Sequence, residues 1–383
     1  MTSGYERNGV HAPIRAESGL RRARELSYHP ELDGVRALAV LAVMVFHVWP
    51  YVGGFDYLGG FLGVDVFFVL SGYLITTLLY REFSARGRIS FGSFYARRAL
   101  RLLPALFLTL IFAWFVYAQL EKPVGPRSYG SSALLALSYV GNWAQVRATL
   151  GVLAHTWSLA IEEQYYLVWP LVMVVSLRLI RSARSIAGLL VLGAVGIAVI
   201  RYLVFFGGNP AAAALTTVTR TDGVILGSAL ALILADPPDA VRRLLARPWV
   251  PVVTGGALLA ASLVFRWNSP ALFRGGLLAV NLCAAMLIGH MVVRPQALAT
   301  RLMSVQPLPA IGRISYGLYL FHIPVNYLVH GHPATRTGWR WVAASFGLSF
   351  LLAGASFLLV ERRALRLKRR FGSMSQMPEA VSA

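Results

Sequence analysis

Apolar runs of about twenty residues recur along the whole chain, separated by short polar segments rich in arginine. A run of this length, about 20 residues, is long enough to cross the hydrocarbon core of a bilayer as a helix. The pattern therefore predicts an all-α polytopic membrane protein with about ten transmembrane helices. The predicted spans cover residues 36–52, 59–80, 103–120, 157–177, 186–206, 221–235, 249–265, 276–293, 312–330 and 341–360.

Positively charged residues are distributed unevenly between the segments that separate the apolar runs. If the N-terminus is cytoplasmic, the cytoplasmic segments hold 27 of the 36 Lys and Arg residues, including those in 81–101, 178–184 and 361–370. Positive residues concentrate on the cytoplasmic side of membrane proteins, so both termini are predicted to be cytoplasmic. The segment 131–143 is apolar but short, and a span there would reverse every later loop. We therefore expect a re-entrant or interfacial helix in that segment.

Composition favours a membrane protein, since 57% of the residues are hydrophobic and only 14% are charged. The net charge of +20 invites a nucleic-acid partner, but the arginines lie in short loops between apolar runs, so none is expected. Residues 1–30 are expected to form a disordered cytoplasmic tail and residues 363–383 a basic cytoplasmic tail, on either side of a membrane domain at 31–362. Neither a secretory signal nor a second soluble domain is expected, and the single cysteine excludes an internal disulfide.

The first predicted span carries an arginine at one end and a histidine near the other. Arg36 and His47 are separated by about 16 Å of helix rise, and eleven steps of 100° bring both side chains to one face. Ionisable groups at membrane depth are costly and usually face a cavity or a partner. Two simpler interpretations stay open: Arg36 extends to the membrane surface, and His47 is a hydrogen-bonded core residue. Asp33 is a candidate ion-pair partner of Arg36 or a helix N-cap.

The second predicted span contains Asp65 within its apolar body and is interrupted by Ser71 and Gly72. A buried carboxylate needs a partner, and Arg36 and His47 are the candidates in the preceding span. Ser71 lacks the flanking glycines of a hydrolase nucleophile elbow. We therefore expect Ser71 and Gly72 to permit close approach of another helix.

Three arginines stand at the cytoplasmic mouth of the third span: Arg97, Arg98 and Arg101. Their charge alone fits the cytoplasmic excess of positive residues, and Arg97 and Arg101 also share a helix face. Guanidinium groups bind phosphate through two parallel hydrogen bonds. The three arginines are therefore a candidate docking site for phosphates that enter from the cytoplasm.

Two adjacent carboxylates, Glu162 and Glu163, lie in the fourth predicted span. Neighbouring side chains on a helix point about 100° apart, so the two cannot share one role, and we expect at least one to be functional. His155 precedes Glu162 by about two helical turns and is expected on the same face.

The later spans add fewer candidates. Arg220 and Asp222 are expected to form an internal ion pair, and His322 is expected to satisfy a carbonyl freed by Pro324. No HExxH, CxxC or acidic cluster suggests a metal, and no Walker A or GxGxxG motif suggests a nucleotide-binding fold.

Six motifs in order resemble a known family. They are the Asp-Gly-x-Arg…His pattern of the first span, GVDVFFVLSGYLI, FYARRALRLLP, TWSLAIEEQYYLVWP, RTDG and SYGLYLFHIPV. Over about residues 28–360 the chain resembles the integral-membrane acyltransferase-3 family. The resemblance implies a multi-pass enzyme of the bacterial inner membrane that takes acyl-CoA from the cytoplasm. Such enzymes O-acylate carbohydrates or, in actinomycetes, secreted natural products such as macrolides.

The resemblance assigns roles to residues of this chain. Arg36 and His47 match the family's Arg-x10-His pair, and Glu162 matches its Trp-Ser-Leu-x-x-Glu motif. The arginines at 97, 98 and 101 match its third-span motif. The implied donor is acyl-CoA, with acetyl-CoA expected, and no metal cofactor is implied.

These roles give a predicted mechanism. A hydroxyl acceptor becomes an effective nucleophile when a base removes its proton, and a neutral imidazole, whose unperturbed pKa is about 6.5, is suited to that task. His47 is the predicted base, oriented by Glu162 or Asp65, and an acyl-His47 intermediate is the alternative. Arg36 would neutralise the thioester oxygen or a CoA phosphate, and the three third-span arginines would hold the nucleotide end of CoA.

The sequence leaves several choices open. The acceptor is a carbohydrate or exported glycan, or else a macrolide-type natural product; the acyl chain length, the side of the membrane on which transfer occurs and the oligomeric state stay open as well. The alternative class is a transporter or permease. That class predicts repeated segments and paired helix breaks in two halves, and the sequence has neither.

Overall fold

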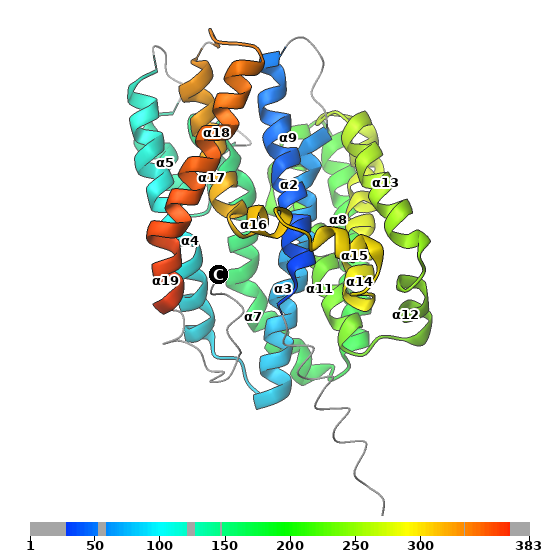
Figure 1. Ribbon diagram of the computed structural model, residues 1–383. Helices are drawn as coiled ribbons and strands as arrows, with labels where there is room; N and C mark the ends of the chain where they lie inside the picture. Colours follow the sequence, from blue (N-terminus) through cyan, green and yellow to red (C-terminus); the bar gives the residue numbers. More distant parts are fainter. Residues whose placement is uncertain (1–27, 53–58, 121–126, 146–147, 333, 368–383) are drawn as a thin grey trace, which may run out of the picture.

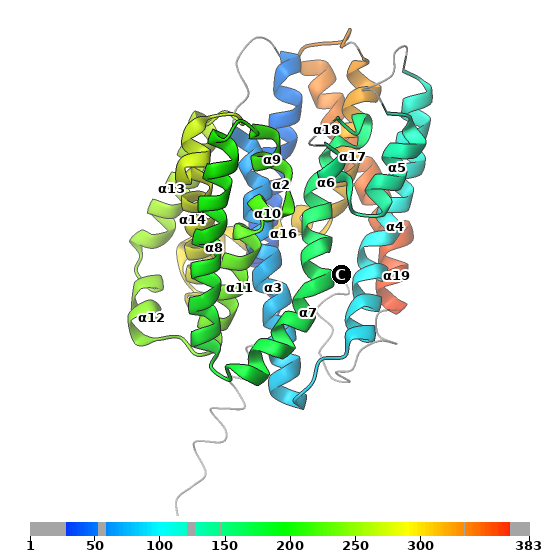
Figure 2. The same ribbon diagram turned by 180° about the vertical axis from the view of Figure 1, so that it is seen from behind.

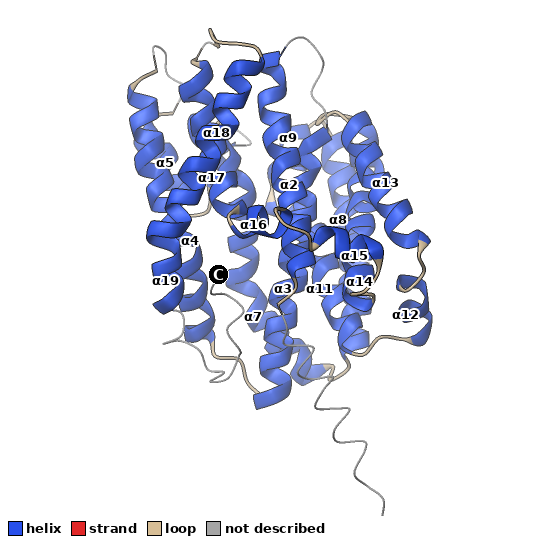
Figure 3. Cartoon of the chain, viewed as in Figure 1, coloured by secondary structure: helices blue, strands red, loops and turns tan. Residues whose placement is uncertain are grey.

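The chain folds into a bundle of helices with no strand among the residues described, as the computed structural model shows in Figures 1 and 3. The description covers residues 28–52, 59–120, 127–145, 148–332 and 334–367. The prediction of an all-α protein is therefore confirmed. Most of the two predicted tails, at 1–30 and 363–383, lies outside the described residues.

The long helices coincide with the apolar runs. Each of the ten predicted ranges falls on a helix of 14 to 28 residues: α2 (Pro30–Val48), α3 (Gly63–Arg86), α4 (Phe91–Ala118), α7 (Trp157–Leu179), α8 (Ala183–Phe206), α11 (Asp222–Ala235), α13 (Trp249–Val264), α14 (Leu277–Val293), α17 (Ser315–His330) and α18 (Trp339–Ser356).

Six stretches of the described chain are long and apolar enough to cross a membrane: Pro30–Val52, Gly59–Arg86, Phe91–Ala118, Ala183–Phe206, Leu272–Val293 and Trp339–Leu367. A seventh candidate is α11 together with α12 (Asp239–Leu245), which meet at a bend of 114°. The chain is thus a polytopic membrane protein. The count of ten spans and the cytoplasmic position of both termini stay predictions.

The segment 81–101, which is predicted to connect two spans on the cytoplasmic side, is mostly helical. Helix α3 continues to Arg86 and ends at Gly87, whose φ of 68° is the left-handed conformation that suits glycine at a helix end. Helix α4 then begins at Phe91. Arginine has a high helix propensity, so the charged residues of this segment extend the two helices beyond the apolar runs.

Short helices connect or cap the long ones. The segment at 131–143 forms α5 (Tyr129–Leu137) and α6 (Gly141–Gln145). Neither is long enough to span a bilayer, which agrees with the predicted re-entrant or interfacial helix. The other short helices are α9 (Pro210–Leu215), α10 (Thr217–Arg220), α15 (Leu298–Met303), α16 (Leu308–Arg313) and α19 (Arg362–Leu367).

Five further short segments have 3-10 or π-helical geometry. They are η1 (Trp49–Val52), η2 (Gly59–Leu62), η3 (Gly151–Thr156), η4 (Leu272–Gly276) and η5 (Phe357–Glu361).

Figures 1 and 2 show the arrangement from two opposite sides. Helices α12, α13 and α14 lie on one side of the bundle, α4, α5, α18 and α19 lie on the other, and α2, α3 and α7 lie between them. The residues predicted to be functional come mainly from the central helices. The candidate site therefore lies inside the bundle.

Glycines bring the central helices into backbone contact. A Cβ atom on Gly72 of α3 would lie 1.9 Å from the Val224 carbonyl oxygen of α11, and one on Gly227 would lie 2.0 Å from the Val69 oxygen. The close approach predicted at Gly72 is therefore confirmed. Helix α2 is held in the same way, because a Cβ on Gly34 would lie 2.0 Å from the Met303 oxygen in α15.

Candidate active site

A group of charged and polar side chains lies where α3, α4 and α7 approach one another. Arg98 donates a hydrogen bond to Glu163 at 3.3 Å, and its guanidinium lies 3.6 Å from the ring centroid of Tyr166. Glu162 accepts a hydrogen bond from the Ser71 hydroxyl at 3.0 Å. The adjacent glutamates thus have different partners, as their 100° separation on the helix predicts.

Arg36 belongs to the same group. Its guanidinium pairs with Asp33 at 3.4 Å, which confirms the predicted ion pair, whereas Asp33 lies inside α2 and is not its N-cap. Arg36 and Arg101 are close enough to repel each other, and Arg36 also interacts electrostatically with Glu162. We define Arg36, Arg98 and Arg101 as the arginine cluster.

Arg97 has a different position from the other two third-span arginines. It pairs with Glu82 of α3 at 3.7 Å, and Glu82 also accepts a hydrogen bond from the Ser90 backbone N–H, so it ties the α3–α4 connection together. The structure therefore brings Arg98 and Arg101 to Arg36 but gives Arg97 an acidic partner outside the arginine cluster.

His47 lies about three turns further along α2 than Arg36, or about 16 Å of helix rise. Its Nδ1 lies 2.9 Å from the Val43 carbonyl oxygen and 3.2 Å from Nε2 of His322 in α17. Neither Glu162 nor Asp65 contacts His47, so the predicted orientation of this imidazole by one of those carboxylates is wrong. The backbone of α2 and a second histidine orient it instead.

The hydrogen bonds define which nitrogen of each neutral imidazole carries the proton. A backbone carbonyl only accepts, so the ring nitrogen bonded to it must be the donor. His47 therefore carries its hydrogen on Nδ1, toward Val43. His322 carries its hydrogen on Nδ1, which lies 2.6 Å from the Tyr319 oxygen, so its Nε2 is an acceptor that shares the single Nδ1–H of His47 with the Val43 oxygen. The free electron pair of His47 is then on Nε2, which makes no hydrogen bond with the described residues.

His155 is the third histidine of this region. Pro324 lacks an N–H, so the Leu320 carbonyl four residues earlier has no helical donor. Nε2 of His155 donates to that carbonyl at 3.0 Å, and the His155 ring centroid lies 5.3 Å from that of His322. His155 thus satisfies the carbonyl freed by the proline. The prediction that His322 would do so was wrong. The Nδ1 atom of His155 is buried without a hydrogen-bond partner in the described chain.

His155 and Glu162 are not brought together, although a continuous helix would place them on one face. Residues 151–156 form the 3-10 segment η3, and α7 begins only at Trp157. The change of helix type alters the angular spacing. As a result, His155 faces the histidines whereas Glu162 faces Ser71 and the arginine cluster.

Asp65 pairs with Arg220 at 3.1 Å. The partners predicted for it, Arg36 and His47, were wrong. Asp222, the predicted partner of Arg220, instead pairs with Arg201 of α8 at 2.7 Å. All four side chains are at least 95% buried. Two arginines and two aspartates therefore compensate one another inside the bundle, as buried charges require.

Arg201 is a residue that the sequence analysis missed. It is fully buried and also donates to the Thr219 carbonyl oxygen at 2.9 Å. An arginine inside the apolar run 186–206 was the available signal, because ionisable groups at membrane depth need a partner.

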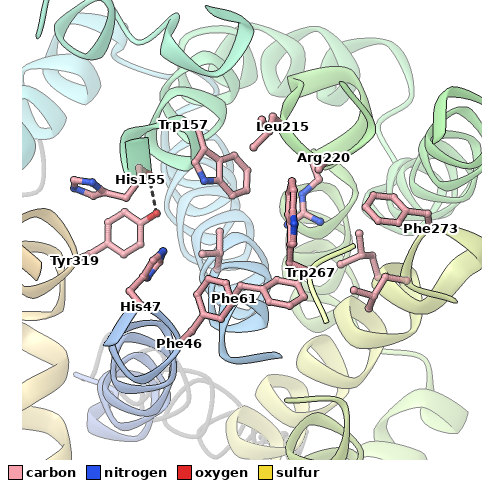
Figure 4. Close-up of a pocket in the computed structure, with 14 residues that line it drawn as sticks. Phe46, His47, Phe61, His155, Trp157, Leu215, Arg220, Trp267, Phe273 and Tyr319 are labelled. Carbon is pink, nitrogen blue, oxygen red and sulfur yellow. Dashed lines mark hydrogen bonds between the residues drawn. The ribbon is translucent and has the colours of Figure 1, made fainter. Parts of the chain in front are cut away.

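A cavity of about 100 Å³ opens beside His47 (Figure 4). Figure 4 shows His47 and Tyr319 on one side of it, Arg220 and Trp267 on the other, and Trp157 and Phe61 between them. A second cavity of about 250 Å³ lies between the end of α2 and α17, and it is lined by His47, Pro50, Tyr51, Ile323, Asn326 and Tyr327. His47 is the residue that the two cavities share.

The site has no evident place for a metal. In the part of the chain that the structure describes, no three His, Cys, Asp or Glu side chains are grouped so that they could hold an ion. The arrangement can instead supply a free imidazole nitrogen between two cavities and a cluster of guanidinium groups at the other end of α2.

Comparisons with known proteins agree with this chemistry. Residues 29–360 match a family described as an acyltransferase domain. YrhL of Bacillus subtilis (strain 168) is 34% identical over 355 residues, which cover 88% of this chain and 54% of that protein. The O-acetyltransferase OatA of Staphylococcus aureus is 32% identical over 322 residues, covering 80% and 52%. The peptidoglycan O-acetyltransferase OatA of Listeria monocytogenes is 30% identical over 355 residues, covering 87% and 55%.

The chain spans about half the length of these curated relatives. No solved structure matches it.

Proposed function

The chain belongs to the acyltransferase-3 family, and from this premise we propose that it is a membrane O-acyltransferase. In this proposal it moves an acetyl or other short acyl group from acyl-CoA to a hydroxyl of a glycan. The single observation that carries the proposal is the free Nε2 of His47, at the junction of two cavities.

His47 is the proposed general base. Its Nε2 takes the proton of the acceptor hydroxyl while that oxygen attacks the thioester carbon. The carbon–sulfur bond then breaks, and the CoA thiolate leaves with the proton that the imidazolium returns. The hydrogen bonds to Val43 and His322 support this assignment, because they hold the Nδ1–H and leave Nε2 unprotonated. An acyl group on His47 Nε2 is the stepwise variant of the same transfer.

The arginine cluster is the proposed anchor for the phosphates of CoA. Arg101 forms no salt bridge within the described part of the chain, although Asp33 interacts with it electrostatically, and Arg36 and Arg98 lie beside it. Three neighbouring guanidinium groups favour a polyanion. The distance along α2 supports a phosphate role for Arg36 and disfavours the thioester role, because a thioester near His47 would be about 16 Å away. The pantetheine arm of CoA would follow α2 between the two ends.

Glu162 and Asp65 take supporting parts in this proposal. Glu162 compensates the positive charge of the arginine cluster while leaving Arg101 available for the donor. Asp65 holds Arg220 at the wall of the cavity beside His47. Both carboxylates would therefore act on the arrangement of guanidinium groups and not on the imidazole.

A glycan is the proposed acceptor because all three relatives are named as O-acetyltransferases and the names of two specify peptidoglycan. The same relatives favour a glycan over a macrolide-type acceptor and an enzyme over a permease. A bacterial plasma membrane, with the donor on its cytoplasmic side, completes the proposal.

The test uses purified protein in lipid nanodiscs with acetyl-CoA and either a chito-oligosaccharide or unacetylated peptidoglycan. The expected result is release of CoA thiol together with an acceptor that has gained one acetyl group by mass spectrometry. Release of thiol without a modified glycan would support transfer to another acceptor class. Absence of both donor binding and thiol release would overturn the proposal.

A further inference from the structure

We propose that the aromatic cavity beside His47 (Figure 4) is the acyl pocket and that its size limits the donor to acetyl and propionyl groups. This inference rests on the proposed function, and it adds the identity of the donor's acyl chain and the residues that select it.

The volume of the cavity matches a short acyl group. A dry cavity of about 150 Å³ holds one benzene molecule, with its six carbons. The cavity beside His47 measures about 100 Å³, so on the same scale it holds about four non-hydrogen atoms. An acetyl group has three such atoms and a propionyl group has four. A sugar ring with its hydroxyls has roughly a dozen and does not fit.

The far wall of the cavity, opposite His47, is largely apolar. Leu215, Leu272 and Leu277 are buried there, and Phe273 is stacked on Phe205 at a centroid distance of 4.1 Å. A glycan hydroxyl on this wall would lose its hydrogen bonds to water without replacing them. An alkyl chain loses nothing there, so the chemistry of this wall selects the acyl group and not the acceptor.

Arg220 also lines the side of the cavity opposite His47 and supplies a polar group that a thioester needs. Arg220 is 95% buried, is held by Asp65, and has an Nε–H with no hydrogen-bond partner in the described chain. Figure 4 places this guanidinium across the cavity from His47. A carbonyl oxygen in the cavity can accept from Arg220 while its carbon lies toward the imidazole. The second cavity, which also reaches His47 and is larger, is then left for the acceptor.

Two substitutions change the size of the pocket in opposite directions. Phe61→Leu removes part of a half-buried ring that packs on Phe46, and Leu215→Phe adds a ring to the far wall. The matched controls are Phe107→Leu in α4 and Leu203→Phe in α8, which make the same exchanges at exposed positions. All variants are compared in nanodiscs with acetyl-, propionyl-, butyryl- and hexanoyl-CoA and one acceptor.

The wild-type protein should lose at least about tenfold in kcat/KM for each carbon beyond propionyl, because a surplus methylene in a closed pocket discriminates by about that factor or more. Phe61→Leu should extend the limit to butyryl, and Leu215→Phe should restrict it to acetyl. The controls should keep the wild-type order. If Leu215→Phe fails to fold, the donor preference of Phe61→Leu alone tests the inference.

Two outcomes overturn the inference while leaving the proposed function intact. One is a wild-type enzyme that uses all four donors equally. The other is a pocket variant with the wild-type donor order but an altered KM for the acceptor, which would make the cavity an acceptor site. A wild-type protein that neither binds any of the four donors nor releases thiol from them overturns both proposals.

Discussion

Nε2 of His322 lies 3.2 Å from Nδ1 of His47, although the two residues are 275 positions apart in the chain. The pair is anchored at both ends, since each imidazole also donates to a backbone carbonyl of its own helix. His322 therefore acts on the proposed base and not on the substrate. It fixes the plane of the His47 ring and directs Nε2 toward the cavities.

Replacement of His322 should lower turnover without affecting donor binding. We expect His322→Phe to reduce kcat by about tenfold, since one hydrogen bond contributes about 0.5–1.5 kcal/mol, and to leave the KM for acyl-CoA unchanged. His322→Gln should recover most of the loss, because its amide oxygen can accept from His47 Nδ1–H. Steady-state kinetics measures both constants. A purely structural histidine would instead give two variants with equally reduced amounts of folded, fully active enzyme.

Loss of the proposed base should have a larger effect. His47→Gln is expected to lower turnover by about 10²–10⁴, the usual contribution of positioned proton transfer, because an amide cannot accept the proton. Binding of acyl-CoA should persist, since the arginine cluster is about 16 Å away. The matched control is His290→Gln, a buried histidine bonded to the Leu245 carbonyl outside both cavities. A folded His47→Gln protein with half of the wild-type turnover would contradict the assignment.

The third-span arginines should differ from one another. We expect Arg101→Ala to raise the KM for acyl-CoA by about tenfold, because lost phosphate contacts weaken binding, while the KM for the acceptor stays the same. Arg97→Ala should change the donor KM less, since Arg97 pairs with Glu82. Because Arg97 and Arg101 are four residues, or about one helical turn, apart, the two variants remove the same group from neighbouring positions and control for each other. Equal effects, or a larger effect of Arg97→Ala, would count against the arginine cluster as the donor anchor.

The pair of Asp65 and Arg220 should contribute strongly to stability. Asp65→Asn leaves a buried guanidinium without its carboxylate, and breaking a buried pair costs about 3–5 kcal/mol. We expect a lower midpoint of thermal unfolding in detergent. The double variant Asp65→Asn with Arg220→Gln should recover much of the stability without recovering activity. A single Asp65→Asn variant that is stable but inactive would instead indicate direct participation of the carboxylate in the reaction.

The orientation in the membrane can be tested with single cysteines in a Cys283→Ala background. If the termini are cytoplasmic, Ser84→Cys at the end of α3 should resist a membrane-impermeant maleimide in intact cells and react after permeabilisation. Asn268→Cys, in the exposed connection after α13, should react in intact cells. The reverse result would invert the predicted topology.

Much of the fold could be predicted from the sequence, because each long apolar run corresponds to one helix. The positions of the ten long helices and the close approach at Gly72 needed only local pattern. The partners of the buried charges could not be derived in the same way. Asp65 lies 155 residues from Arg220, and Asp222 lies 21 residues from Arg201, so each pairing depends on which helices become neighbours. Helical periodicity placed Arg36 and His47 on one face of α2. It could not show that His322, on a helix distant in sequence, would be the hydrogen-bond partner of His47.

The proline in α17 couples two distant positions of the chain, Pro324 and His155. Because Pro324 cannot donate to the Leu320 carbonyl, that oxygen is available to His155, and the contact holds η3 against α17. Pro324→Ala would restore a backbone N–H that competes with His155 for the Leu320 carbonyl. His155→Ala would leave that carbonyl without a hydrogen-bond donor. Each change then makes the other less harmful, so the two substitutions should be non-additive in a double-mutant cycle. Among homologous sequences, positions 155 and 324 should consequently covary, with histidine at the first retained where proline is kept at the second.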